Sequence, residues 1–72
     1  MTPRQCRAGR TLAGMSQLDL ARVAKLGLST VRDYETERRE VSAEAIAKMK
    51  AALEKAGVQF INGKRPGVRL KA

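Results

Sequence analysis

Apolar residues recur at helical spacing over the first 57 positions, in stretches separated by glycine, serine and charged residues. Thr2 followed by Pro3 predicts a helix start, because a hydroxyl side chain caps a helix and proline fits its first position. We expect this helix to run to about Ala13 and to stop at Gly14.

Three further helices are predicted. The stretch "QLDLARVA" is preceded by Ser16 as its cap, and a third helix runs from residue 28 to about residue 37. The longest helix, from residue 43 to about residue 56, is preceded by Ser42 and followed by glycine. Their inward apolar positions are Leu20, Ala21, Ala24, Leu26, Val31, Tyr34, Ile46, Met49, Ala52 and Leu53. The pattern predicts a mainly α bundle of four helices.

Beyond residue 57 the period changes to alternation, since "VQFI" and "VRLK" alternate apolar and polar residues around the turn-forming "NGKRPG". Residues opposite each other in an antiparallel pair share a face, so burying all four apolar side chains requires the pairs Phe60 with Val68 and Val58 with Leu70. A two-residue turn at the Asn-Gly dipeptide would put Pro66 deep in the second strand, so we expect a longer loop. An isolated two-stranded ribbon is marginal in water. These strands are therefore expected to form a hairpin packed on a helix, or to pair between two subunits.

The chain is strongly basic. It has 15 Lys and Arg against 7 Asp and Glu, a net charge of +8 and a pI near 10.6. Such a balance favours an anionic partner, nucleic acid or an anionic membrane surface, although solubility alone also requires charge. Only Tyr34 and Phe60 are aromatic, too few for the stacking platforms of single-strand binders. The composition therefore suits a reader of double-stranded DNA better.

Several classes of protein are disfavoured. The single cysteine, Cys6, permits no internal disulfide, and we expect it to be a small core residue in a reduced, cytoplasmic setting. The chain has no histidine, no cysteine paired with a base and no phosphate-binding loop, so we expect no enzyme, metal or cofactor. Neither a secretory leader nor a membrane span is expected, because no apolar stretch is long enough.

Residues 17–36, "QLDLARVAKLGLSTVRDYET", place apolar residues wherever two short helices meet across a tight turn, with the small Ala21 at their close approach. The sequence "MSQLDLARVAKLGLSTVRDYE" resembles the Cro and CI repressor type of helix-turn-helix family, also called the xenobiotic-response-element family. The resemblance covers residues 4 to about 56, including "RAGRTLAGMSQ", and the tail "AGVQFINGKRPGVRL" resembles C-terminal extensions of small bacterial members. It implies a lambda-repressor-like DNA-binding domain over residues 1–57, with residues 58–72 as a β extension for dimerisation or packing.

The turn departs from the family pattern. Members usually carry glycine where this chain has Lys25, and a serine or threonine cap where it has Gly27. Either Lys25 adopts the left-handed conformation, or the turn shifts so that Gly27 adopts it and Ser29 caps. The packing register from Ala21 to Val31 favours the first arrangement.

The resemblance also suggests which side chains reach DNA. On a helical wheel Leu28, Ser29, Arg32, Asp33 and Thr36 form one outward arc, opposite Val31 and Tyr34. In the family this arc enters the major groove, which assigns base reading to Leu28, Ser29, Arg32 and Asp33. Arginine can bond guanine, aspartate can accept from cytosine, and leucine can touch a thymine methyl. The alternative is that Arg32 and Asp33 are solvated charges, or that Asp33 pairs with Arg32 or with a neighbour of Glu37.

Other polar residues receive roles by the same resemblance. Gln17 at the start of the second helix, Lys25, Thr36, Arg38 and Arg39 are expected to contact phosphates. Arg10 and Glu35 match a family ion pair that ties the first helix to the reading helix, the alternative being two independent surface charges. In the tail, Lys64, Arg65, Arg69 and Lys71 could contact phosphate, or Arg69 and Lys71 could protect a strand edge.

One short helix covers only a few base pairs, so we expect a homodimer on a palindromic operator. The sequence thus predicts a bacterial, sequence-specific regulator of transcription, a repressor, whose partners are double-stranded DNA and a second copy, with no membrane. An antitoxin that also binds a toxin protein is the alternative, with "VQFINGKRPGVRL" as the candidate toxin-binding segment.

Overall fold

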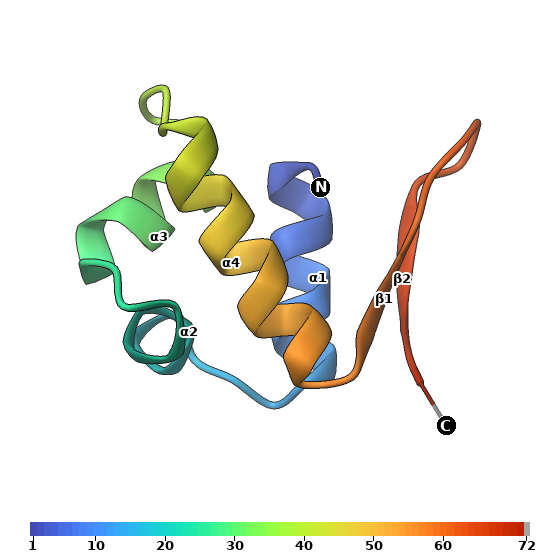
Figure 1. Cartoon of the computed structure of the whole chain (residues 1–72). Coiled ribbons are helices and arrows are strands. Elements are labelled where there is room, and N and C mark those ends of the chain that lie inside the picture. Colours follow the sequence, from blue (N-terminus) through green and yellow to red (C-terminus); the bar gives the residue numbers. More distant parts are fainter. Residues whose placement is uncertain (72) are drawn as a thin grey trace.

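The computed structural model describes residues 1–71 and is mainly helical over them, as expected. Its elements in chain order are α1 (Pro3–Leu12), α2 (Gln17–Ala24), α3 (Leu28–Glu35), α4 (Ala43–Lys55), β1 (Val58–Ile61) and β2 (Gly67–Leu70). In Figure 1, α2 and α3 lie to one side of α4 and α1 to the other, with the hairpin beyond α1. No helix in residues 1–71 is long and apolar enough to cross a membrane.

Side-chain caps fix the starts of three helices, at the positions the sequence predicts. The backbone N–H of Gln5 donates to the Thr2 hydroxyl at 3.1 Å, and the Gln5 side chain accepts from Thr2 N at 2.9 Å. Ser16 and Asp19 form the same reciprocal box at α2. Ser42 caps α4 by accepting from the N–H of residue 45. Each box satisfies N–H groups that a helix start leaves without partners.

A residue with left-handed backbone conformation follows each of the first three helices. Gly14, Lys25 and Glu37 follow α1, α2 and α3 with φ of 69°, 58° and 54°. At α3 the N–H of Glu37 donates to Tyr34 O and that of Arg38 to Asp33 O, the Schellman pattern. Because this motif closes the helix at Glu35, α3 is two residues shorter than expected, whereas α1 and α4 each end one residue early.

The core lies where the four helices meet. Cys6, Leu20, Val31, Met49 and Leu53 are its largest fully buried side chains. Two expected core residues, Leu26 and Ile46, are only partly buried and pack against its rim.

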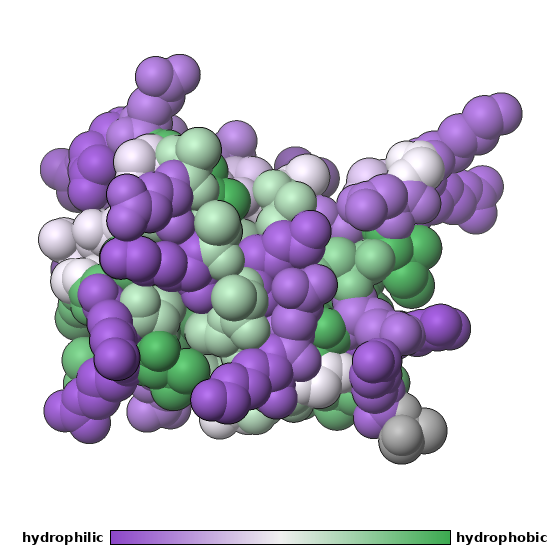
Figure 2. Space-filling model, viewed as in Figure 1, coloured by the Kyte–Doolittle hydropathy of each residue, from purple (hydrophilic) through white to green (hydrophobic). Residues whose placement is uncertain are grey.

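The two strands pair within one chain, in the predicted register. Val58 lies opposite Leu70 and Phe60 opposite Val68, and the loop spans residues 62–66. The expectation that all four apolar side chains are buried is wrong. Val58 is 2% exposed but Leu70 is 47% exposed, because it lies at the end of its strand. Figure 2 shows apolar surface along the strands below a hydrophilic hairpin tip.

Gln5 attaches the hairpin to α1. It is buried, and its amide donates to Ile61 O at 3.0 Å and to Gly67 O at 3.1 Å, one carbonyl from each strand. One turn further along α1, a Cβ at Gly9 would lie 3.0 Å from Val58 Cγ1, so the helix and β1 are in close contact. The hairpin is thus packed on a helix.

Candidate nucleic-acid interface

Helix α3 has a buried side and an exposed side. Val31, Tyr34 and Glu35 are buried, while Ser29 and Arg32 are exposed on the opposite side. The other predicted base-reading residues, Leu28 and Asp33, are partly buried. The predicted outward arc is therefore accessible mainly at its centre.

The turn before α3 has the arrangement favoured by the packing register. Lys25 is left-handed, with φ 58° and ψ 47°, and its N–H donates to Arg22 O while that of Leu26 donates to Ala21 O. Gly27 is extended, with φ −71° and ψ 147°. The shifted-turn alternative is wrong, and Lys25 carries a backbone strain of roughly 1 kcal/mol.

Gly27 precedes α3 and has no side chain that could cap the start of this helix. Among the described residues no side chain caps the first N–H groups of this helix. These groups carry the positive end of the helix dipole, which favours an approaching anion. The start of α3 is therefore electrostatically suited to a DNA backbone or base edge.

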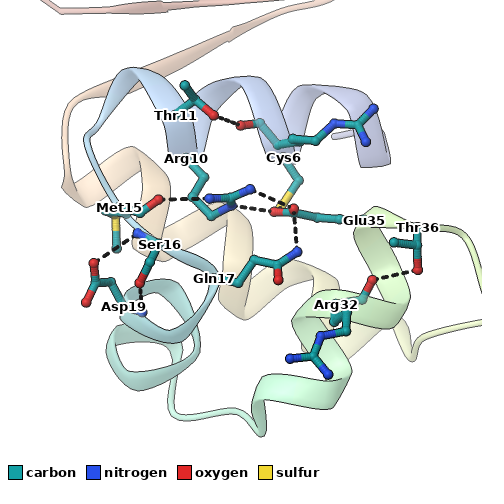
Figure 3. A network of polar contacts seen from close by, with 11 residues as sticks. Cys6, Arg10, Thr11, Met15, Ser16, Gln17, Asp19, Arg32, Glu35 and Thr36 are labelled. Atoms are coloured by element: carbon teal, nitrogen blue, oxygen red, sulfur yellow. Dashed lines mark hydrogen bonds and ion pairs between the residues drawn. The ribbon is translucent and has the colours of Figure 1, made fainter.

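Arg10 and Glu35 connect α1 to α3 through two parallel bonds (Figure 3). Arg10 Nε lies 2.8 Å from Glu35 Oε2 and Arg10 Nη2 lies 3.0 Å from Oε1, while Nη1 donates to Met15 O at 3.0 Å. The Glu35 side chain is 1% exposed and that of Arg10 16%. Such a bidentate pair fixes orientation as well as supplying energy.

Two more side chains complete the environment of Glu35. Gln17 Nε2 donates to Oε1 at 3.1 Å, and the Cys6 thiol donates to Oε2 at 3.5 Å. Burial alone would raise the pKa of Glu35, but the hydrogen bonds from Arg10 and Gln17 and the charge of Arg10 lower it below its usual value. The carboxylate therefore stays ionised and joins α1, α2 and α3.

On the other side of α3, Asp33 is bonded to the loop that follows. Arg39 Nε lies 2.8 Å from Asp33 Oδ2, and its Nη1 donates to Glu40 O at 3.3 Å. The side chain of Asp33 is 19% exposed and that of Arg39 51%. The Asp33 carboxylate consequently has a cationic partner before any DNA arrives.

The remaining predicted contacts are exposed. They are Lys25, Thr36 and Arg38. The Thr36 hydroxyl donates to Arg32 O at 2.8 Å, and the Arg32 guanidinium points away from the Glu35 network in Figure 3. Four cationic side chains, of Lys25, Arg32, Arg38 and Arg39, thus belong to α3 and the segments that flank it.

A family model described as helix-turn-helix matches residues 7–58, more than half of the chain. The chain belongs to this helix-turn-helix family, of the Cro/CI repressor type. It is a DNA-binding regulator. Among curated proteins, none matches the sequence. The match begins within α1 and ends at the first residue of β1, so most of the hairpin lies outside it.

Within this helix-turn-helix unit, the sequence did not reveal three contacts. Gln17 was expected at a phosphate but donates to Glu35, leaving one amide hydrogen for another acceptor. Cys6 was expected only as a core residue, but it also donates to Glu35, and burial raises its pKa to about 12. Arg39 was expected at a phosphate but pairs with Asp33. Helical spacing places Gln17 and Cys6 near the Arg10–Glu35 pair, so the sequence carries a signal for their contacts. The contact of Arg39 with Asp33 depends on the path of the loop after α3.

Proposed function

We propose that this protein is a dimeric, sequence-specific repressor that inserts α3 into the major groove of a palindromic operator. The observation that supports the proposal is that one side of α3 is buried and the opposite side is exposed. Its buried side is held by Arg10, Gln17 and Cys6 through Glu35, while Ser29 and Arg32 face away from the core. A rigidly held helix keeps its outward side chains in register with base edges.

Base reading is assigned to four residues. Arg32, exposed at the middle of the helix, donates two bonds to guanine O6 and N7, and Ser29 bonds a base edge beside it. Leu28 touches a thymine methyl with the part of its side chain left exposed. Asp33 accepts from a cytosine amino group while Arg39 offsets its repulsion from phosphate.

Phosphate contacts are assigned to both ends of α3. Lys25 and the second amide hydrogen of Gln17 contact one DNA strand near the start of the helix. Arg38 and Arg39 contact the backbone near its end, together with the Thr36 hydroxyl once it exchanges its bond to Arg32 O for a phosphate oxygen. Contacts of this kind position a protein on DNA without reading sequence. The net charge of +8 supplies long-range attraction to the duplex.

A dimer follows from the size of the reading helix. Eight residues reach only a few base pairs, and two-fold dimers gain specificity by binding half-sites about one helical turn apart. A dimer bound over a promoter excludes polymerase, which makes repression the expected sign of regulation.

The antitoxin alternative usually requires a disordered or separately folding segment that binds the toxin. The segment considered for that role includes β1 and β2, which Gln5 holds against α1. This contact favours the regulator over the antitoxin.

The test is selection of bound sites from random duplex DNA, followed by matched arginine variants at one salt concentration. Arg32→Ala is expected to lose about 1–3 kcal/mol of binding on the selected site and much less on unrelated DNA. Arg38→Ala removes the same charge and is expected to lose equally on both duplexes. An equal loss for Arg32→Ala would reduce it to a phosphate contact and remove the main support for base reading.

A further inference from the structure

We propose that the outer face of the hairpin is a second, sequence-independent site for duplex DNA. A protein that holds its operator through α3 would then bind another DNA segment on its opposite side. The outer face is defined by the exposed basic residues of the hairpin and its loop, Lys64, Arg65, Arg69 and Lys71. This inference goes beyond the proposed function and rests on it at one point, because α3 is taken to hold the operator.

Positive charge is distributed unevenly along the chain. Residues 17–42, which contain α2, α3 and the loop after α3, hold five basic and five acidic residues, so this segment has no net charge. Residues 57–71 hold four basic residues and no acidic one. Half of the net charge of +8 therefore lies in a segment that the proposed operator contact does not use.

The strand register places Arg69 on the outer face. Val58 and Phe60 lie on the inner face, because a Cβ at Gly9 of α1 would be 3.0 Å from Val58 Cγ1 and 3.8 Å from Phe60 Cε1. Side chains alternate along a strand, so Gln59 and its partner Arg69 lie on the opposite face. There Arg69 Nε donates to Gln59 Oε1 at 2.6 Å, which holds the guanidinium against the strand pair.

The other three basic residues extend this face in both directions. Lys71 follows Arg69 by two residues, about 7 Å along the strand, and Lys64 and Arg65 lie in the loop that joins the strands. In the described part of the chain, none of the four forms an ion pair. Glu54 lines a hollow with Arg69 and Lys71 but pairs with neither. The four charges are therefore available to an anionic partner.

The outer face is turned away from the reading helix. Helix α1 is bonded to α3 by Arg10 and Glu35 and to both strands by Gln5. In Figure 1 it accordingly lies between the hairpin and α3. A helix with its side chains is about 10 Å thick, and the outer face lies beyond both α1 and the hairpin. A straight duplex in contact with α3 does not reach the outer face of the same subunit, so this face is left for a second anion.

The chemistry of the outer face fits duplex DNA better than other polyanions. Binders of single strands stack bases on aromatic rings, but the one aromatic residue of the hairpin, Phe60, is on the inner face. A membrane surface requires a continuous apolar face, whereas Gln59 and Arg69 occupy the middle of this one. Duplex phosphates are bound by exposed lysine and arginine alone. Having four charges and no base-reading helix, the outer face is the weaker of the two DNA sites.

Bridging of two duplexes tests the outer face. A duplex carrying the selected operator is immobilised, the protein is added, and capture of a labelled unrelated duplex is measured. Lys64→Ala combined with Arg65→Ala removes the two loop charges, which are exposed and lie outside the strands. Lys50→Ala combined with Lys55→Ala is the matched control, because it removes the same charge from α4, which belongs to neither DNA site.

We expect the loop variant to capture at least about fivefold less labelled duplex than the wild type, since it loses two of four phosphate contacts. Its affinity for the operator should change by less than about twofold, and the α4 variant should retain both properties. Arg32→Ala with Arg38→Ala weakens the α3 contact and exposes the second site by itself. In that background the loop substitutions should reduce the dependence of log K on log salt for unrelated duplex by roughly two units.

Three results would overturn the proposal: no capture by the wild type, equal losses in the loop and α4 variants, or a loss of operator affinity that matches the loss of capture. The same holds if the loop charges are needed to capture single-stranded RNA or phosphatidylserine vesicles but not duplex DNA. If selection yields no operator, the proposed function fails. The salt dependence in the Arg32 and Arg38 background still decides whether the outer face binds DNA.

Discussion

Arg39 Nε lies 2.8 Å from Asp33 Oδ2, so two side chains that the sequence assigned to different DNA contacts are bonded to each other in the free protein. The pair joins the loop after α3 to the reading helix. Asp33 is the more buried partner, and its carboxylate lies on the side of α3 proposed to meet DNA. A negative charge in that position reduces attraction to any duplex and limits the phosphate contacts that Arg39 can make.

Asp33→Asn should therefore bind unrelated duplex DNA more tightly than the wild type. Removing one carboxylate and releasing Arg39 should strengthen nonspecific binding by roughly fivefold and steepen the dependence of log K on log salt by about one unit. Fluorescence anisotropy over a salt series measures both quantities.

Glu44→Gln is the matched control for Asp33→Asn. Glu44 also pairs with a basic residue, Lys48 at 3.6 Å, but it lies on α4 and is 82% exposed. The same change in net charge there should alter nonspecific binding much less. Equal effects of the two substitutions would show that only net charge matters.

The sequence predicted the parts of the fold that depend on local chemistry. The caps at Thr2, Ser16 and Ser42 depend on neighbouring residues, and the helices begin where those caps predict. The strand register followed from one requirement, that apolar side chains share a face. The left-handed Lys25 followed from the packing positions on either side of the turn.

Features that depend on the path of a loop, or on how far the core extends, were not predicted. Glu37 is left-handed without being glycine, so the sequence carries no signal for the early end of α3. The pairing of Asp33 with Arg39 follows from that end, because the Schellman turn brings the loop back toward the helix. The alternation in β2 predicted that Leu70 lies on the same face of the hairpin as Val68. It could not predict that the helices do not extend far enough to cover Leu70.

Arg10→Met should strongly destabilise the protein. It would leave the Glu35 carboxylate, 1% exposed, without its cationic partner, and breaking a buried pair in this way costs about 3 kcal/mol or more. Urea unfolding measures the loss. Arg7→Met, on the exposed side of the same helix, should change the free energy of unfolding by less than about 0.5 kcal/mol. Similar losses for both variants would mean that the pair contributes nothing of its own.

Acid should weaken the same network. The pKa of Glu35 is lower in the folded protein than its ordinary value of 4.5, so the stability it contributes is present above that value and is lost as pH falls through the folded pKa. Glu35→Gln lacks this contribution, so its deficit in the free energy of unfolding relative to the wild type should shrink as the pH falls below 4.5. Unfolding curves of both proteins from about pH 7 to pH 3 test this. A deficit that stays constant would contradict this prediction. The pKa of Asp19 is also lowered, but Asp19 is present in both proteins and therefore does not change the difference between them.

Lys25→Gly should be more stable than Lys25→Ala. Both substitutions remove the same charge, but only glycine adopts a φ of 58° without strain. The expected difference is about 1 kcal/mol in the free energy of unfolding. Both variants should lose DNA affinity equally, which separates the backbone effect from a phosphate contact. If alanine were the more stable replacement, the left-handed conformation would not be strained.

Gly9→Ala tests how closely α1 packs against the hairpin. Alanine is favoured over glycine within a helix by about 1 kcal/mol, yet the new Cβ would lie 3.0 Å from Val58 Cγ1, and Val58 is too buried to move freely. We expect net destabilisation of about 1–2 kcal/mol, as for other overpacked cores. Gly67→Ala is the control, because a Cβ there meets nothing within 4 Å.

Combining Gly9→Ala with Val58→Ala separates crowding from other causes. Val58→Ala alone leaves a cavity beside α1, and the methyl group at position 9 partly fills the space that Val58 Cγ1 vacates. The double variant should therefore be more stable than the sum of the single losses predicts, by about 1 kcal/mol. Strictly additive losses would show that α1 and β1 do not compete for this space. The hairpin would then depend on the Gln5 bonds more than on packing against α1.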